Sequence, residues 1–240
     1  MGSRRWLLVV ALVVVVAVAG FAAGYAVHST TTATTSITST TSTTPTSTTN
    51  SLPDPTWVAV WPSASSSLRY RTPTAAALGF AHAVLRMRAV TTGPFAQGDS
   101  RSGEVSVRTT PAGPLTTVLV RQLTSDNSWW VLGASADQLS IAEPGALETI
   151  SSPLFVTGSS TAFEGVINDA LYQDGVTTPL AAGTAMGGSN GVVAPYATTL
   201  TFAAPTHPYG VLVVFARSAK DGSVLAASAI RVAFATVAGH

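Results

Sequence analysis

The hydrophobic pattern divides the chain into three stretches. An apolar run without a charged residue covers residues 6–27, and residues 29–51 consist almost entirely of Ser and Thr. From about residue 53 to residue 235, short apolar runs alternate with polar turns. A helix over the first run would be roughly 33 Å long, which is enough to cross the hydrocarbon core of a membrane. The pattern therefore predicts a single transmembrane helix, a polar stalk and a folded C-terminal part.

The charges beside the apolar run predict its orientation. Arg4 and Arg5 are the only charged residues before it, so the positive-inside rule makes residues 1–5 a cytoplasmic tail and exports everything after the helix. A cleaved signal peptide is the alternative, with the cleavage site at residues 17–19 and a secreted mature protein. Cleavage there would leave a mature chain that begins with mostly apolar residues. The length of the run favours the anchor.

The N-terminal part has two further features, a candidate helix-packing motif and a polar stalk. Gly20 and Gly24 form a GxxxG pattern, which is compatible with a helix–helix dimer, although small residues are also frequent near the ends of unpaired membrane helices. The stalk, residues 28–52, has too few apolar residues to offset the entropic cost of ordering, so we expect it to be disordered. Its composition also suits O-glycosylation, with an unmodified spacer as the alternative.

Residues 53–136 are predicted to form a small α+β module. Thr72 is a suitable N-cap and Pro73 fits the first helical turn, and apolar residues at helical spacing continue to Met87. A helix followed by an antiparallel meander makes an α+β unit. The strand-like runs of this module lie at residues 104–109, 115–123 and 128–134.

Residues 137–236 are predicted to form an all-β immunoglobulin-like sandwich. About seven short alternating runs in a hundred residues are typical of this architecture, and a small barrel is the alternative. Asp221 and Gly222 lie between two apolar runs and predict a hairpin turn. The main runs lie at residues 139–141, 154–157, 166–173, 198–203, 210–217 and 225–234.

Three motifs follow one another in this second module: Ile141–Pro144, Ser151–Gly158 and Ala162–Gly165, with a closing hairpin at residues 218–222. The ordered series resembles the immunoglobulin-like domain family of bacterial spore germination over about residues 139–235. The resemblance implies an extracytoplasmic binding or scaffolding sandwich, with no catalytic residues to transfer from the family. It does not by itself imply a role in sporulation.

Asp169 departs from the pattern of that family. The register that turns Ile167 and Leu171 inward also turns Asp169 inward, where the family pattern would have an apolar residue. Either the register shifts at this point, or Asp169 lies near the end of the sandwich with a partner. The sequence leaves both explanations open.

Composition and charge exclude several classes of protein. The chain has no cysteine, which excludes disulfides, Cys-ligated zinc, iron–sulfur clusters and thiol catalysis. A net charge of +1 argues against a nucleic-acid partner, because phosphate neutralisation needs a basic excess. The first module carries seven arginines against four acids, and the second carries seven acids against three basic residues. Attraction between these charges would favour packing of the two modules against each other.

The motifs that could carry chemistry are weak. Gly187–Gly191 satisfies GxSxG, but glycines flank the serine and no helix pattern follows it, so we interpret the segment as a loop between strands. The histidines have no paired ligand spacing, so we predict no metal site, no cofactor and no catalytic residue. Adjacent strand residues point to opposite faces, so only one of the two neighbouring tryptophans is expected to enter the core. The candidate binding surface comprises Trp129, Trp130, Arg101, Arg108, Phe163 and Glu164.

These observations predict a membrane-anchored protein of the bacterial cell envelope, single-pass in the plasma membrane, with a non-catalytic binding or scaffolding ectodomain. The expected partner is a cell-wall polymer or another envelope protein. One alternative is a cell-wall or glycan hydrolase that uses Glu164 or Asp169 as its carboxylate. Another is an accessory subunit of an envelope sensor complex, which would signal through a helix partner in the membrane.

Overall fold

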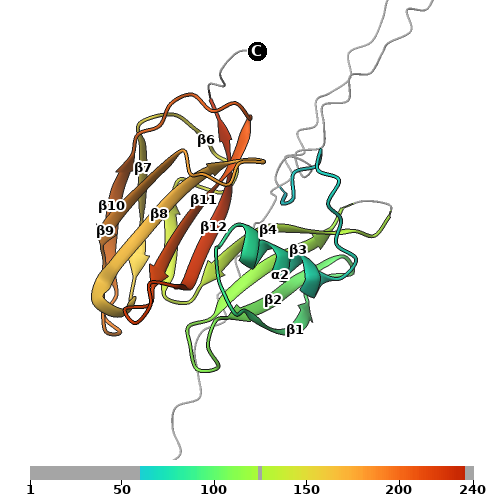
Figure 1. The fold of residues 1–240 in the computed structure, drawn as a ribbon, viewed down its shortest axis with the longest axis horizontal. Coiled ribbons are helices and arrows are strands. Elements are labelled where there is room, and N and C mark those ends of the chain that lie inside the picture. Colours follow the sequence, from blue (N-terminus) through green and yellow to red (C-terminus); the bar gives the residue numbers. More distant parts are fainter. Residues whose placement is uncertain (1–59, 124–125, 236–240) are drawn as a thin grey trace, which may run out of the picture. The chain divides into compact units, whose positions relative to one another are not determined.

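A computed structural model describes residues 60–123 and 126–235. Within these ranges the chain is mostly antiparallel β-sheet with one short α-helix (Figure 1). The predicted transmembrane helix, the stalk and the Gly20–Gly24 pair lie outside the described residues. Inside the described ranges, no helix has both the length and the apolar character needed to cross a membrane.

Helix α2 (Pro73–Ala83) begins where the sequence predicts. The Thr72 Oγ1 atom accepts a hydrogen bond from the Ala75 N–H at 3.2 Å, which satisfies one of the free donors of the first turn. Pro73 has no N–H and needs no partner there. Met87, which the helical spacing included, lies beyond the end of the helix but is buried.

The first sheet consists of β1 (Thr91–Gln97), β2 (Ser102–Arg108), β3 (Thr116–Gln122) and β4 (Trp129–Ala136). The strands pair antiparallel in chain order, and α2 contacts all four of them on one face (Figure 1). The sequence predicts β2, β3 and β4 but not β1, because Gly93 and Pro94 are typical of a turn. The pairing of β1 with β2 is irregular at this point, since the register shifts between Thr92 and Phe95.

Eight further strands are described: β5 (Leu139–Glu143), β6 (Thr149–Ile150), β7 (Leu154–Ser160), β8 (Val166–Gln173), β9 (Ala181–Met186), β10 (Ala194–Leu200), β11 (Tyr209–Arg217) and β12 (Val224–Phe234), with a short 3₁₀ turn η1 (Phe163–Gly165) before β8. One layer has the order β12-β11-β8-β9 and the other has the order β5-β7-β10. Leu171, Leu212 and Val156 are among the side chains that form one buried cluster from both layers. The predicted hairpin joins β11 and β12, and Gly222 takes a φ of 70° in its turn.

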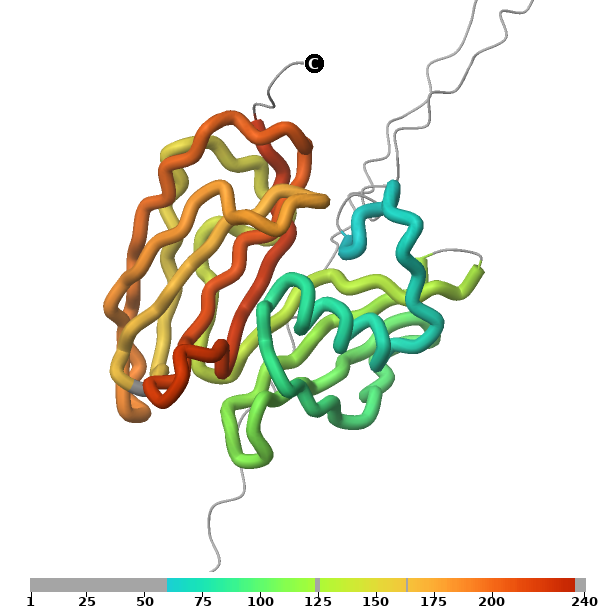
Figure 2. The backbone as a smooth tube through the Cα atoms, in the orientation of Figure 1, coloured from blue at the N-terminus to red at the C-terminus, as the bar shows by residue number. Residues whose placement is uncertain are grey.

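The two modules share one sheet. Strand β4 pairs antiparallel with β12, where Ala134 lies opposite Ala229 and Gly133 lies opposite Ile230. The path of hydrogen-bonded strands therefore runs β1-β2-β3-β4-β12-β11-β8-β9, and Figure 2 follows the backbone through it.

The two modules also share a buried apolar cluster. Val211 and Val213 of β11 alternate with residues of the sandwich core, and they join the cluster that contains Phe80 of α2. The ion pairs of the described residues, which join Arg71 to Asp126 and Arg231 to Asp174, each lie inside one module. The contact between the modules therefore combines apolar packing and strand pairing with side-chain hydrogen bonds, such as that from the Ala136 N–H to Ser228 Oγ at 2.9 Å. Neither of these two ion pairs crosses between the modules.

Asp169 lies inside the sandwich in a regular register. It is opposite Val214 on β11 and Gly183 on β9, without a shift in either pairing. Its exposed fraction is 2%, and neither carboxylate oxygen has a hydrogen-bond partner in the described part of the chain. Both explanations offered from the sequence are therefore wrong, because the register does not shift and no partner satisfies the carboxyl group.

Candidate binding cleft

A cleft of about 210 Å³ lies beside the C-terminal end of α2. Trp61, Val84 and Arg86 from the first module line it, together with Tyr172 of β8 and Val176 of the following turn. A mostly apolar hollow with a few polar groups has the general character of a ligand site. The cleft is therefore the candidate site that the structure supplies.

Arg86 is the main charged side chain of the cleft. It lies in the turn after α2 with a φ of 58°, a conformation that residues other than glycine seldom adopt. Its Nη2 atom donates a hydrogen bond to the Thr177 carbonyl oxygen at 2.9 Å. Its Cζ atom lies 5.6 Å from the centre of the Tyr172 ring, at the distance of a cation–π contact. These two contacts hold the guanidinium against β8 and its turn.

The turn that follows β8 is held by a buried ion pair. Arg231 Nη1 and Nη2 donate to Asp174 Oδ1 and Oδ2, both at 2.6 Å, and the Arg231 side chain is 2% exposed. Such a bidentate pair fixes orientation as well as distance. Beside it, Gln173 Oε1 accepts the Thr206 N–H at 2.7 Å. The end of β8 and the turn after it, which form the side of the cleft that includes Tyr172, are therefore held by Arg231 and by the Thr206 backbone.

The two tryptophans of β4 point to opposite faces, as the strand period predicts. Trp129 is partly buried against the cluster under α2, with its ring centre 5.2 Å from that of Phe95. Trp130 lies on the other face and is 1% exposed, with the Arg69 Cζ 4.8 Å from its ring centre. Trp130 therefore presents no surface to a ligand, which corrects its place in the predicted binding surface.

The other predicted surface residues lie apart. Arg101 is exposed just before β2, whereas Arg108 is the last residue of that strand, so the two do not converge. Glu164 is exposed in η1 with a φ of 63°, and Phe163 precedes it in the same turn. Arg101, Arg108 and Glu164 do not line the cleft beside α2.

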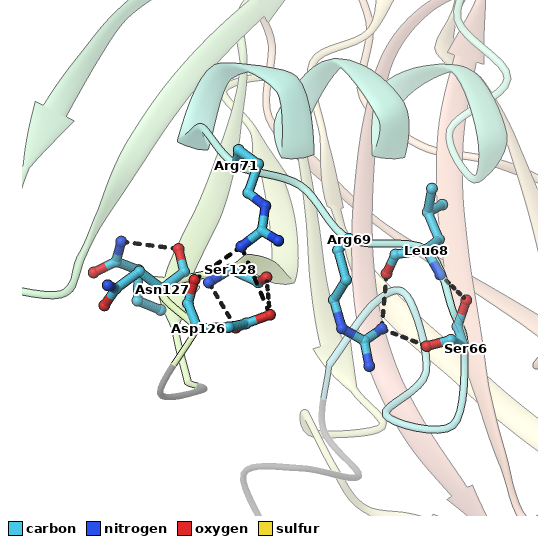
Figure 3. Close-up of polar contacts among 8 residues, drawn as sticks. Ser66, Leu68, Arg69, Arg71, Asp126, Asn127 and Ser128 are labelled. Carbon is cyan, nitrogen blue, oxygen red and sulfur yellow. Dashed lines mark hydrogen bonds and ion pairs between the residues drawn. The ribbon is translucent and has the colours of Figure 1, made fainter.

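Two arginines before α2 contact backbone carbonyls instead of lining a site (Figure 3). Arg69 Nη1 donates to the carbonyl oxygens of Ser66 and Leu68. Arg71 Nη1 donates to the Asp126 carbonyl oxygen at 2.9 Å and lies 3.8 Å from its Oδ2 atom. The Arg71 contacts fasten the segment before α2 to the turn between β3 and β4, and the Arg69 contacts lie within that segment. We assign both arginines a structural role.

The features that the hydrolase alternative would use do not form a site. Gly187–Gly191 is a loop between β9 and β10, as the sequence predicts, without the helix that a nucleophile elbow needs. Asp169 is buried in the sandwich and has no access to a polymer. The described residues contain no cluster of three or more His, Cys, Asp and Glu side chains that would suit a metal ion.

Sequence reasoning misses the cleft because its residues are far apart in the chain. Arg86 appears in the sequence only as one of the arginines of the first module, and nothing links it to Trp61 or Tyr172. An exposed arginine after a helix is too common to mark a site. Only the continuous sheet and the turn after β8 place these side chains around one hollow.

Comparison with known families identifies the second module. Residues 138–223 match the family described as the immunoglobulin-like domain of bacterial spore germination. This segment is therefore an immunoglobulin-like domain of that family, and the resemblance inferred from the motifs is confirmed. It includes Tyr172 and Val176, whereas Arg86 lies before it. No curated protein and no solved structure matches the chain.

Proposed function

We propose that the protein is a membrane-anchored component of the bacterial cell envelope whose ectodomain binds a partner without catalysis. The observation that carries this proposal is the match of residues 138–223 to an immunoglobulin-like domain, since such sandwiches hold binding loops on a rigid scaffold. The uncharged run at residues 6–27 supports a single-pass anchor, and residues 28–52 suit a spacer. The partner is a cell-wall polymer or another envelope protein.

The polar groups around the cleft suit binding better than catalysis. Both carboxylate oxygens of Asp174 accept hydrogen bonds from Arg231, and the side-chain oxygen Oε1 of Gln173 accepts from the Thr206 N–H. Neither group is available as a general base, which must reach the proton that it removes. Arg86 remains to orient an anionic group, so the cleft is the expected point of contact.

Co-sedimentation with isolated cell walls tests this proposal. The detergent-solubilised full chain is compared with Val176→Trp, which fills the cleft, and with Val192→Trp, which makes the same change at a position that is 67% exposed. We expect the wild type and Val192→Trp to sediment with walls and Val176→Trp to lose at least tenfold in affinity, with an unchanged far-UV CD spectrum. Equal retention of all three would contradict binding in the cleft. A wild type that sediments neither with walls nor with envelope membranes would contradict the proposed function.

A further inference from the structure

We propose that the cleft beside Arg86 binds the carboxyl terminus of a short peptide whose last residue has a small apolar side chain. This inference rests on the proposed function and specifies the ligand for the same site. It follows from the charge of the cleft, the chemistry and size of its walls, and the way in which the guanidinium is held.

The charge of the cleft matches a single carboxylate. Of its charged lining residues, Asp174 is neutralised by Arg231, and no ion pair of the described residues includes Arg86. One positive charge therefore remains for a ligand. A guanidinium has five N–H donors in a fork that fits a carboxylate bidentately, and one of them already binds the Thr177 carbonyl oxygen. A single arginine suits a monoanion better than it suits a doubly charged phosphate.

The walls of the cleft match a small apolar side chain. Val84, Val176, Val211 and the partly buried Trp61 line it. Its volume of about 210 Å³ is smaller than that of most small-molecule pockets, which measure about 300–1,000 Å³, so it suits a small group. A sugar ring would need several hydrogen-bonding side chains, but Gln173 Oε1 and both oxygens of Asp174 already accept hydrogen bonds from the protein. The Gln173 amide N–H groups and the Thr177 hydroxyl are the further polar side-chain groups of the lining. These observations favour an aliphatic residue beside its carboxylate over an acidic sugar.

Arg86 is held in position before any ligand arrives. Its positive φ, its hydrogen bond to Thr177 and its position over Tyr172 restrict the guanidinium to one region of the cleft. Backbone strain of this kind persists where the surrounding structure holds it, and it is frequent at ligand sites. A side chain that is already ordered loses less conformational entropy on binding.

Calorimetric titration of the full chain in detergent tests the inference. The probes are N-acetyl-D-alanyl-D-alanine and N-acetyl-L-alanyl-L-alanine, each with a free or an amidated carboxyl end. The two stereoisomers distinguish a cell-wall peptide from the end of a protein chain. The variants are Arg86→Gln and, as a matched control, Arg88→Gln, because Arg88 is exposed nearby but does not line the cleft.

We expect at least one free-acid dipeptide to bind to the wild type. Its amide should bind at least tenfold more weakly, and Arg86→Gln should lower the affinity for the free acid by at least tenfold. Arg88→Gln should leave that affinity unchanged. Any of three results overturns the inference. The acid and the amide bind equally well, Arg86→Gln binds the dipeptide with unchanged affinity, or neither dipeptide binds at millimolar concentration. If walls still retain the wild type in these cases, the proposed function stands and only the ligand is wrong. Tighter binding of an acidic monosaccharide than of both dipeptides also overturns it and identifies a glycan site.

Discussion

At the scale of single residues, Asp169 has the least favourable environment described. Its carboxyl group faces the sandwich core without a hydrogen-bond partner, and burial raises its pKa to about 6. The same core raises the pKa of the Tyr196 hydroxyl, first through burial and then through the negative charge of Asp169. The Tyr196 hydroxyl donates to the Ser140 carbonyl oxygen at 2.6 Å, so it does not satisfy the carboxylate.

This environment predicts a specific dependence of stability on pH. The folded state binds the Asp169 proton more tightly than the unfolded state does, because its pKa is raised from 3.8 to about 6. The contribution of Asp169 to the free energy of unfolding is therefore greatest below about pH 4, falls as the pH rises to about 6, and stays low above that. The full loss is about 3 kcal/mol, at 1.36 kcal/mol for each pKa unit.

Asp169→Asn should therefore be more stable than the wild type at pH 7, by up to about 3 kcal/mol. Its free energy of unfolding should not show the decrease between pH 4 and 6 that Asp169 causes in the wild type. Urea unfolding followed by tryptophan fluorescence at several pH values measures this difference. Asp137→Asn, which removes the same charge at an exposed position, serves as the control. Parallel stability profiles for the wild type and Asp169→Asn would contradict the account of this carboxyl group.

At the scale of elements, the contact between β4 and β12 depends on a glycine. A Cβ atom added at Gly133 would lie 2.8 Å from the Ala229 carbonyl oxygen, which is backbone and cannot move away by rotation. Gly133 lies opposite Ile230 in this pairing. A side chain here would push apart the two strands that join the modules.

Gly133→Ala should accordingly lower the free energy of unfolding by about 1–3 kcal/mol, the usual cost of overpacking. Gly98→Ala is the matched control, because the nearest atom to its added Cβ, apart from the neighbouring residues, would be the Ser102 carbonyl oxygen at 3.7 Å. Urea unfolding followed by both fluorescence and far-UV CD measures the effect. If Gly133→Ala were as stable as Gly98→Ala, the result would contradict tight packing between β4 and β12 at Gly133.

The elements that the sequence predicts are those with strong local signals. Thr72 and Pro73 predict the start of α2, and Asp221 with Gly222 predicts the β11–β12 hairpin. Strand β9 is missed because its small residues give little apolar alternation, and β1 is missed because its Gly-Pro pair is typical of a turn. The cleft could not be predicted, since it depends on the pairing of β4 with β12 and on contacts between distant segments.

At the scale of the whole molecule, the described residues form two modules with a common core. The outer face of β11 and β12 contributes Val211, Val213 and Ala229 to the cluster under α2, so the immunoglobulin-like domain would expose these side chains without the first module. The family match covers the second module alone. The cleft combines residues of both, and the first module thus adds Arg86 to a site that the immunoglobulin-like domain lacks by itself.

The proposed function requires this two-module unit to work outside the plasma membrane on an N-terminal anchor. The chain has no cysteine, so single cysteines report topology without background. Ala112→Cys lies at an exposed position before β3, and Ser3→Cys precedes the apolar run. In intact bacteria with permeable outer layers, a membrane-impermeant maleimide should label Ala112→Cys, and it should label Ser3→Cys only after lysis. Labelling of Ser3→Cys in intact cells, or protection of Ala112→Cys until lysis, would contradict the account.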